Sequence, residues 1–283
     1  METRPWHWKL RGQVLDLAPR SWVMGIVNLT PDSFSDGGRF ENAEAGVAHA
    51  AALLAEGADF LDFGGESTRP GAEPVPEAEE LRRVIPVLQR VAAEMPGALL
   101  SIDTAKASVA RAAIAAGAGI INDVTAGRDP GMLPLAAEQG AGLVLMHMQG
   151  EPRTMQSAPH YQDVVEEVGD FFLRRLEAAV AAGVDPEQIV FDPGIGFGKT
   201  LEHNLALMRA IPALTARVGR PLLLGVSRKR WLGDITGRTV NDRLAASLGG
   251  LAACICHGAK ILRVHDVMSS CDVARILDRV LST

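Results

Sequence analysis

The stretch ALLSIDTAKASVARAAIAAGAGIIND, residues 98–123, contains one complete unit of the pattern that decides the fold of this chain. An apolar run ends in Asp103, an alanine-rich segment of helical composition covers 105–116, and Gly117 leads into a second apolar run, 118–123. Glycine readily takes the left-handed backbone conformation that ends a helix. The unit therefore predicts a strand, a helix and a second strand.

The same unit repeats along the chain, because short apolar runs that end in a polar residue alternate with stretches rich in Ala, Leu, Glu and Arg. The eight runs cover 22–28, 58–62, 98–103, 118–123, 141–147, 188–192, 221–227 and 259–265. Eight buried parallel strands alternating with helices over about 250 residues predict an α/β fold, the (β/α)8 or TIM barrel. In that fold the C-terminal ends of the strands meet, so the polar endings are expected to form one active site.

The helices are expected between these runs. They are predicted at 41–56, 77–94, 105–116, 130–139, 161–182, 200–218, 240–257 and 270–281. The helix–glycine–strand joint recurs at four further positions: Gly57, Gly140, Gly183 and Gly258. No low-complexity linker divides the chain, so a single domain over 1–283 is expected. Within the N-terminal extension 1–20, residues 6–17 predict a short β-hairpin that closes the bottom of the barrel.

Composition excludes several classes of protein. With 283 residues, 47% of them hydrophobic and 22% charged, the chain suits a globular protein with a substantial core. The net charge of −6, without a face rich in Lys and Arg, argues against a nucleic-acid partner. The sequence has neither a membrane-length apolar run nor a signal peptide, so no membrane association is expected. Cys254, Cys256 and Cys271 predict buried, reduced thiols, and we expect a cytoplasmic protein.

Two connections on the expected catalytic face differ from the others. The segments 29–40 (LTPDSFSDGGRF) and 64–76 (GGESTRPGAEPVP) are long and rich in Gly, Pro and Ser. Long loops on this face of a barrel are typically lids, and ordinary surface loops are the alternative. The lid interpretation is favoured by side chains that are unusual in plain connections: Phe34, Asp36, Thr68 and Arg69.

Positive side chains gather at the last two runs. The seventh run leads into Ser227-Arg-Lys-Arg230, and the eighth contains Arg263 and His265, which alternate along a strand and so share the face toward the mouth. Barrels often bind phosphate near the ends of strands 7 and 8, which favours an anion site here. The alternative is that these charges pair with carboxylates. Anion binding is favoured because an inward-facing arginine is costly without a purpose or a partner.

Acceptor and amide side chains end four other runs: Asp62, Asp103, Asn122 and Asp192. Asp103 alone could be the cap of the helix at 105–116. Four such residues from four strands predict a pocket for a flat, nitrogen-rich ring, with about 1.5–3 kcal/mol for each bond to a carboxylate. Met146 could pack on that ring or belong to the plain core. Asn28, at the end of the first run, offers an oxygen ligand suited to Mg²⁺ shared with phosphate oxygens.

These segments together resemble the dihydropteroate synthase family. The matching stretches span almost the whole chain in order: 24–38 (MGIVNLTPDSFSDGG), 62–71 (DFGGESTRPG), 101–104 (SIDT), 121–123 (IND), 146–149 (MHMQ), 192–199 (DPGIGFGK), 225–229 (GVSRK) and 263–267 (RVHDV). The first two are highly specific to the family.

The resemblance implies an enzyme that joins 6-hydroxymethyl-7,8-dihydropterin diphosphate to p-aminobenzoate, releasing diphosphate and forming 7,8-dihydropteroate for folate biosynthesis. It also implies Mg²⁺, a homodimer, and sulfonamides as competitors of p-aminobenzoate. A pterin-dependent methyltransferase and a non-catalytic pterin-binding paralogue are the alternatives. The methyltransferase would have no use for the two lids, and a paralogue is expected to have lost a lid or a strand-end residue.

The resemblance also implies roles for individual residues. The catalytic residues are Asp103, Lys229, Arg263 and His265. The pterin is bound by Asp103, Asn122, Met146, Asp192, Phe197, Lys229 and Arg263. The diphosphate is bound by Asn28, Arg263 and His265, and Asn28 also ligates Mg²⁺. The p-aminobenzoate site is formed by Phe34, Thr68, Arg69, Pro70 and Lys229, with Asp36 ordering the first lid through Arg69.

The expected chemistry requires no strong general base, because the attacking aromatic amine is neutral near pH 7. Loss of diphosphate from the exocyclic carbon is expected to proceed through a dissociative, SN1-like transition state. Arg230 follows Lys229 where many relatives have serine, so contacts to p-aminobenzoate are expected to differ from the serine type.

Overall fold

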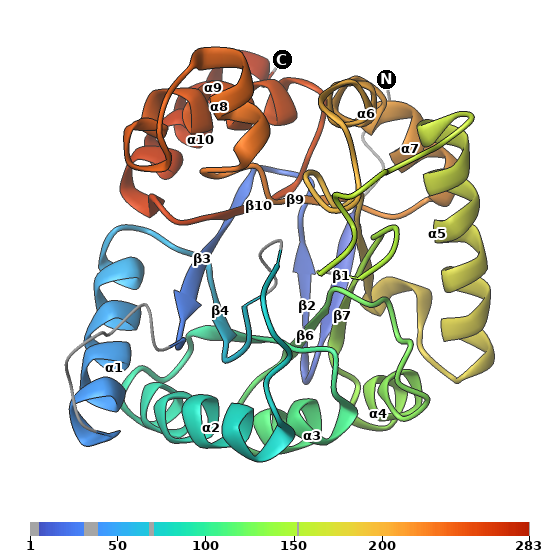
Figure 1. The fold of residues 1–283 in the computed structure, drawn as a ribbon. Helices are drawn as coiled ribbons and strands as arrows, with labels where there is room; N and C mark the ends of the chain where they lie inside the picture. The colour runs from blue at the N-terminus through green and yellow to red at the C-terminus, as the bar shows by residue number, and fades with distance from the viewer. Residues whose placement is uncertain (1–5, 31–38, 68–70, 152, 283) are drawn as a thin grey trace.

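The protein is a nearly closed barrel, seen along its axis in Figure 1, and the computed structural model describes residues 6–30, 39–67, 71–151 and 153–282. In these ranges eight parallel strands pair in the order β8-β7-β6-β5-β4-β3-β10-β9. A bridge between Phe191 and Leu222 joins the two edges of the sheet. The strands are β3 (Trp22–Asn28), β4 (Phe60–Gly64), β5 (Leu99–Asp103), β6 (Ile120–Asp123), β7 (Gly142–Met146), β8 (Ile189–Asp192), β9 (Leu223–Leu224) and β10 (Ile261–Val264). The predicted (β/α)8 barrel is confirmed.

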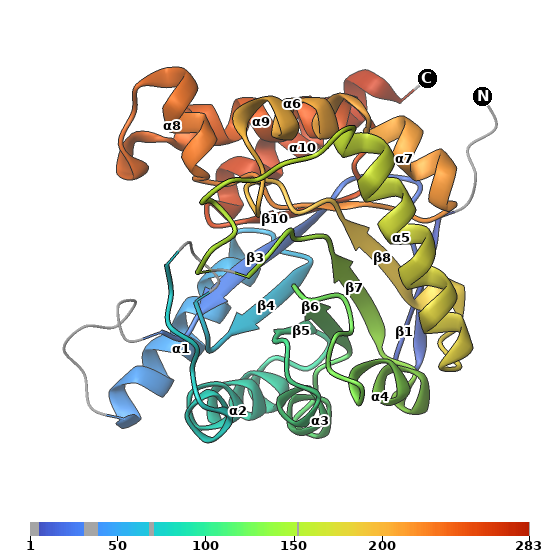
Figure 2. The same cartoon turned by 45° about the vertical axis from the view of Figure 1, so that its right-hand side comes forward.

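The N-terminal hairpin closes one end of the barrel. Strands β1 (His7–Leu10) and β2 (Gln13–Asp16) pair antiparallel, and β1 contacts β7 and β8 (Figure 2). The buried residues Trp8, Leu10 and Leu17 pack against inward side chains of the early parts of the strands. Those side chains are Met24, Phe60, Ile120, Val144, Val190, Leu223 and Ile261. The predicted hairpin is confirmed.

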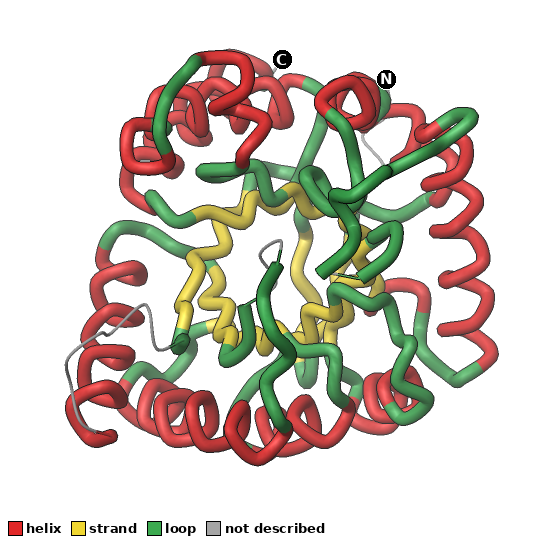
Figure 3. Tube along the Cα trace, viewed as in Figure 1, coloured by secondary structure: helices red, strands yellow, loops and turns green. Residues whose placement is uncertain are grey.

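The helices surround the ring of strands (Figure 3). They are α1 (Arg39–Ala55), α2 (Glu77–Glu94), α3 (Ala107–Ala115), α4 (Met132–Gln139), α5 (Val164–Ala181), α6 (Leu201–Arg209), α7 (Ile211–Val218), α8 (Arg230–Thr236), α9 (Leu244–Cys256) and α10 (Val267–Leu281). Two short 3-10 helices, η2 (Pro186–Gln188) and η3 (Val240–Asp242), lie between them. Within the described ranges, no helix is both long and apolar enough to cross a bilayer.

Three sequence predictions about the helices need correction. The helix expected at 200–218 is divided, because Pro212 has no N–H to donate to the Met208 carbonyl and its ring clashes with that carbonyl. The helix expected at 240–257 begins only at Leu244, after η3. Helix α8 lies in a stretch, 230–236, that was expected to be a connection.

The predicted helix–glycine–strand joints are confirmed. The glycines take positive φ angles: Gly57 (106°), Gly117 (118°), Gly140 (61°), Gly183 (91°) and Gly258 (91°). At Gly117 a side chain is also excluded by space, because a Cβ would lie 2.7 Å from that of Ala92. The prediction of buried cysteines holds for Cys254 and Cys271 but is wrong for Cys256, which is exposed.

Candidate active site

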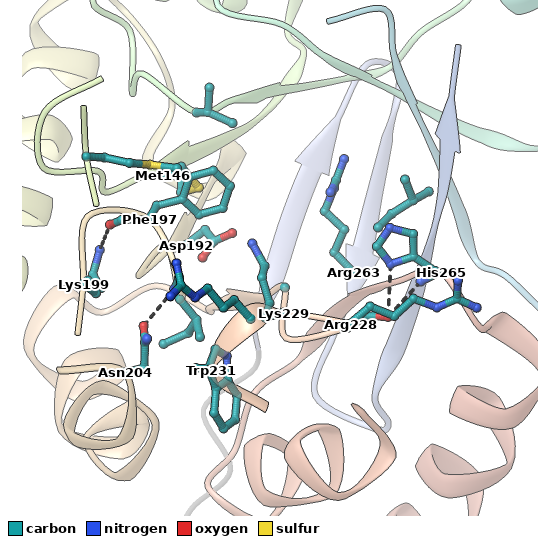
Figure 4. A pocket seen from close by; sticks show the side chains of 18 of the residues that line it. Met146, Asp192, Phe197, Lys199, Asn204, Arg228, Lys229, Trp231, Arg263 and His265 are labelled. Atoms are coloured by element: carbon teal, nitrogen blue, oxygen red, sulfur yellow. Dashed lines mark hydrogen bonds between the residues drawn. The ribbon is translucent and has the colours of Figure 1, made fainter. Parts of the chain in front are cut away.

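A cavity with a volume of about 860 Å³ lies at the C-terminal ends of the strands (Figure 4). Many of the side chains predicted from the sequence line it, although they come from seven different strand ends or following loops. They are Asn28, Asp103, Asn122, Met146, Asp192, Phe197, Lys229, Arg263 and His265. The polar strand endings therefore converge on one side of the barrel, as the parallel topology requires.

Arg263, on β10, is held across the cavity by two carboxylates. Its Nε donates to Asp62 Oδ2 at 2.6 Å and its Nη2 donates to Asp103 Oδ2 at 2.7 Å. Burial alone lowers the pKa of Arg263, but the charges of Asp62 and Asp103 outweigh this effect and raise it above its ordinary value. The pairing with carboxylates, which was the alternative considered from the sequence, is therefore present in this structure.

Asp62 supports two of the predicted site residues at once. It is fully buried, and its Oδ2 also accepts a hydrogen bond of 2.9 Å from Asn122 Nδ2. One carboxylate thus fixes the orientations of both Arg263 and the Asn122 amide. Because a buried charge is stable only with partners, Asp62 and Arg263 form a unit whose members depend on each other.

Asp103 faces the cavity and does not cap the helix that follows it. The first N–H groups near α3 are satisfied by Asp129 Oδ2, at 2.9 Å from the Ala107 nitrogen, and by Thr104 Oγ1, at 3.2 Å from the Lys106 nitrogen. Burial raises the pKa of Asp103 to about 7, with Asp62 adding to the effect and Arg263 opposing it. The carboxyl group can therefore hold or release a proton near neutral pH.

Asp192 begins a glycine-rich loop that packs tightly on the end of β7. Its Oδ1 accepts a hydrogen bond of 2.7 Å from the Gly194 nitrogen, and burial raises its pKa. Gly194 has a φ of 64°, and a Cβ there would lie only 2.0 Å from the His147 carbonyl oxygen. Only glycine fits this position. The loop places Phe197 in a small apolar cluster that includes Met146.

Lys229 lies over the ring of Phe197, with its Nζ 4.0 Å from the ring centroid. Burial lowers the pKa of Lys229 to about 8, while the negative charge of Asp192 opposes this shift. Such a lysine combines a positive charge at neutral pH with contact to an aromatic face. It is therefore well suited to a planar heterocycle that carries hydrogen-bond acceptors.

Arg228 and Arg230, the sequence neighbours of Lys229, make other contacts. Arg228 has a left-handed φ of 56°, its nitrogen donates to Ser247 Oγ at 2.9 Å, and its side chain forms an ion pair with Asp266. The Arg230 side chain is 86% exposed and lies 3.9 Å from Asp234. All three basic residues line the cavity, but Lys229 is the least exposed of them and the one that contacts the Phe197 ring.

His265 is neutral in this site. Its Nδ1 lies 3.1 Å from Ser227 Oγ, and burial together with Arg263 lowers its pKa to about 3. The imidazole can therefore act as a hydrogen-bonding group, whereas the positive charge beside it comes from Arg263.

Comparison with known proteins agrees with this geometry. Residues 24–265 match the family model described as pterin binding enzyme. The dihydropteroate synthase of Neisseria meningitidis serogroup C is 51% identical over 259 residues, covering 89% of this chain and 90% of the relative. The chain belongs to the dihydropteroate synthase family. It is an enzyme of the transferase class, like its relatives.

Solved structures of the family have the same fold. The Xanthomonas albilineans dihydropteroate synthase with 4-aminobenzoic acid superposes with a TM-score of 0.90 at 48% identity, covering 98% of this chain and 99% of that one. The same protein in complex with 7,8-dihydropteroate gives a TM-score of 0.86 at 46% identity, covering 97% and 99%. The resemblance seen in the sequence motifs is therefore confirmed over the whole barrel.

Residues 31–38 of the first predicted lid and 68–70 of the second lie outside the described residues. This applies to the residues assigned to p-aminobenzoate and to the first lid: Phe34, Asp36, Thr68, Arg69 and Pro70. Their roles stay predictions.

Two features of the site differ from what the sequence predicts. Asp62 is predicted to accept hydrogen bonds from the ring, whereas its Oδ2 accepts them from Arg263 and Asn122. The sequence predicts no contact between His147 and Lys199, yet both are buried, with Lys199 Nζ 3.0 Å from His147 Nδ1. The signal in the sequence is that Lys199 directly follows the glycine-rich segment Gly194–Gly198. Such a segment forms a tight loop, so the next side chain can return to the backbone of the loop itself.

Proposed function

We propose that this chain catalyses the dihydropteroate synthase reaction, in which 6-hydroxymethyl-7,8-dihydropterin diphosphate and p-aminobenzoate give 7,8-dihydropteroate and diphosphate in folate biosynthesis. The observation that carries the proposal is the convergence of Asp103, Asn122, Asp192, Lys229 and Arg263 on one cavity. Family relatives solved with 4-aminobenzoic acid and with 7,8-dihydropteroate support this reading over a methyltransferase or a silent paralogue.

The pterin would lie between the polar strand ends and the Phe197 ring. Asp103 and Asp192 accept hydrogen bonds from ring and amino N–H groups, and the Asn122 amide can bond the ring edge. Lys229 donates to a ring acceptor, while Phe197 and Met146 pack on the ring face. Because Asp103, Asn122 and Asp192 are buried, the ring would be held in a fixed orientation.

The diphosphate would be bound by Arg263, His265 and Asn28. Nε and Nη2 of Arg263 are engaged by Asp62 and Asp103, which leaves Nη1 to donate to a phosphate oxygen. His265 is held next to it by Ser227, and the negative diphosphate would favour protonation of this imidazole. The leaving group would thus be stabilised by fixed donors that need little rearrangement.

Asn28 fits a magnesium ion that arrives with the substrate. Its amide oxygen is a hard, neutral ligand that lines the cavity. Among the ranges that the structure describes, no group of three His, Cys, Asp or Glu side chains could hold a metal ion. Asn28 would therefore supply one ligand, with the others coming from diphosphate oxygens and water. When bound, Mg²⁺ would neutralise charge on the departing diphosphate.

Bond breaking would lead bond making in this site. The bond between the exocyclic carbon and the diphosphate oxygen breaks, and the pterin ring delocalises the positive charge left on that carbon. The ionised Asp103 would stabilise this cation electrostatically. The p-aminobenzoate nitrogen then attacks with its lone pair and loses a proton to water, so no strong base is needed. The two loops would exclude water from the cation.

We further propose a cytoplasmic homodimer that is inhibited by sulfonamides at the p-aminobenzoate site. The support for a dimer is an apolar strip on α10, where Ile276 and Val280 lie one turn apart and are 63% and 72% exposed. The stretch 244–255, an alternative dimer contact, packs mainly on the barrel through Leu251 and Cys254. If the protein is a dimer through this strip, an Ile276→Glu variant should have half the wild-type molecular mass in light scattering.

Release of diphosphate with both substrates and Mg²⁺ tests the main proposal. We expect release that depends on p-aminobenzoate, and a loss of about 100-fold or more in Lys229→Ala, as for removal of other groups that stabilise transition-state charge. Thermal melts of both proteins serve as the control for folding. Pterin binding without any p-aminobenzoate-dependent release would contradict the synthase assignment and favour the silent paralogue.

A further inference from the structure

Lys199 is a buried lysine that the proposed reaction does not use. Its side chain is almost wholly inaccessible, with 3% of the residue exposed. Within the described residues no carboxylate lies at ion-pair distance from its Nζ, and burial lowers the pKa of Lys199 to about 7, although the more distant charge of Asp192 opposes this shift. Burying an ammonium group without a paired carboxylate is strongly unfavourable. Some other interaction must therefore account for its position.

The contacts of Lys199 join two segments of the cavity wall. Its Nζ lies 2.9 Å from the Phe197 carbonyl oxygen (Figure 4). It also lies 3.0 Å from His147 Nδ1 and 3.3 Å from the His147 carbonyl oxygen. Burial lowers the pKa of His147 to about 3, so the ring is neutral and its Nδ1 can accept a hydrogen bond from the ammonium. Lys199 thus links the end of β7 to the loop that follows β8.

The linked segments are in very close contact. A Cβ at Gly194 would lie 2.0 Å from the His147 carbonyl oxygen, and one at Gly198 would lie 2.5 Å from the Gln149 carbonyl oxygen. No side chain fits between the two segments, so their backbones pack directly against each other. Lys199 joins them, because its Nζ donates to carbonyl oxygens from both segments.

We propose that Lys199 is a positioning residue for the pterin site, which fixes the Phe197 carbonyl against the end of β7 and so holds the Phe197 ring under Lys229. The inference rests on the proposed function, since it concerns the same pterin pocket. The Phe197 ring has Lys229 Nζ on one face at 4.0 Å and shares an apolar cluster with Met146. A shift of the loop would move Phe197 and also Asp192, which begins the same loop.

Comparison of Lys199→Met with Lys260→Met tests the proposal. Lys260 is a matched control, because its Nζ also donates to a backbone carbonyl, that of Ala18, at 2.8 Å, but at the opposite end of the barrel. We expect Lys199→Met to raise KM for the pterin diphosphate about 10- to 100-fold, as for loss of hydrogen bonds to a charged group. KM for p-aminobenzoate should not change, and Lys260→Met should change neither constant. A pterin KM that stays at the wild-type value would overturn the proposal.

A double-mutant cycle shows whether Lys199 acts through Phe197. If it does, Lys199→Met combined with Phe197→Leu should weaken pterin binding no more than the stronger single variant. Fully additive losses would mean that Lys199 does not work through the ring. If Lys199→Met does not fold, His147→Phe replaces it in the cycle, because it removes the Nδ1 acceptor but keeps the lysine and an aromatic ring.

Calorimetry with 6-hydroxymethylpterin separates this proposal from the proposed function. A wild-type protein that binds this pterin but shows no turnover would contradict the synthase assignment alone. Under that outcome, tighter binding to wild type than to Lys199→Met still supports the positioning role. Equal affinities for the two proteins would overturn it.

Discussion

The two ends of the barrel use the same strands for opposite purposes. At the N-terminal end, Trp8, Leu10 and Leu17 seal the barrel with apolar side chains. At the C-terminal end, strands finish in buried polar groups such as Asp103 and Asp192. The first end contributes stability at about 1.5–3 kcal/mol for each large side chain buried. The second end holds charges that need partners and so carries a cost in stability.

This difference explains why the charged end is built in pairs and networks. Arg263 neutralises Asp62 and Asp103, and Asp62 in turn orients Asn122. Lys229 has no carboxylate at ion-pair distance within the described residues, so its positive charge is left for a ligand. Variants at the two ends should therefore separate activity from stability.

Arg263→Ala should have the largest effect, because it lowers activity and stability at once. Removing one stabiliser of the leaving group is expected to lower turnover about 100- to 1,000-fold. Leaving Asp62 and Asp103 as uncompensated buried charges should also lower the free energy of unfolding by about 3–5 kcal/mol. Diphosphate release and urea unfolding measure the two effects. A variant with wild-type stability would show that the carboxylates do not depend on Arg263.

Trp8→Ala should affect stability alone. The indole is fully buried, its Nε1 donates to the Gln188 carbonyl at 2.8 Å, and its ring contacts Phe60. Its loss should lower the free energy of unfolding by about 3–5 kcal/mol. At a temperature where the variant is folded, kcat should match wild type. A large fall in kcat of the folded variant would mean that the two ends are not independent.

The pH dependence of kcat/KM should reflect the titration of Lys229 and Asp103 at the C-terminal end of the barrel. The pKa of Lys229 is lowered to about 8 and that of Asp103 is raised to about 7. If the reaction needs the lysine protonated and the aspartate ionised, kcat/KM should fall about tenfold per pH unit above and below this range. Lys229→Arg should move the alkaline limb to higher pH, because arginine stays protonated. An unchanged alkaline limb would assign it to another group.

Stability should respond to pH in the opposite sense. The folded-state pKa of Lys229 lies below its ordinary value of 10.5, so between about 8 and 10.5 the unfolded chain binds the extra proton. The contribution of this group to stability therefore rises with pH over the window in which activity is lost. Urea unfolding of wild type and Lys229→Met at both ends of the window checks this. Equal pH slopes for the two proteins would count against it.

Gly12→Ala should give the smallest effect. Gly12 lies in the turn between β1 and β2 with a φ of 77°, and a Cβ would meet no atom within 4 Å. The cost is therefore backbone strain alone, about 1–2 kcal/mol of unfolding free energy. Thermal melts and kcat measure it. A loss as large as that of Trp8→Ala would mean that the turn secures the hairpin as much as the buried indole does.

The order of elements could be predicted from the sequence because it depends on local patterns. Apolar runs of strand length, alanine-rich helices and glycines such as Gly117 act within a few residues of each other. The division at Pro212 also had a local signal, which the continuous helical composition concealed. Helix α8 could not be separated from a connection, because seven residues are too few to show a periodic pattern.

What the sequence determined by itself is the barrel, the end at which chemistry takes place and the family. Strand alternation decides that Arg263 faces inward, since this is a property of one strand. The tertiary structure alone decided that Arg263 meets Asp62, 201 residues away, and Asp103, 160 residues away. It also decided that Lys199 bonds His147 and the Phe197 carbonyl. These contacts depend on how the strands close around the axis, and no pattern within one segment contains that information.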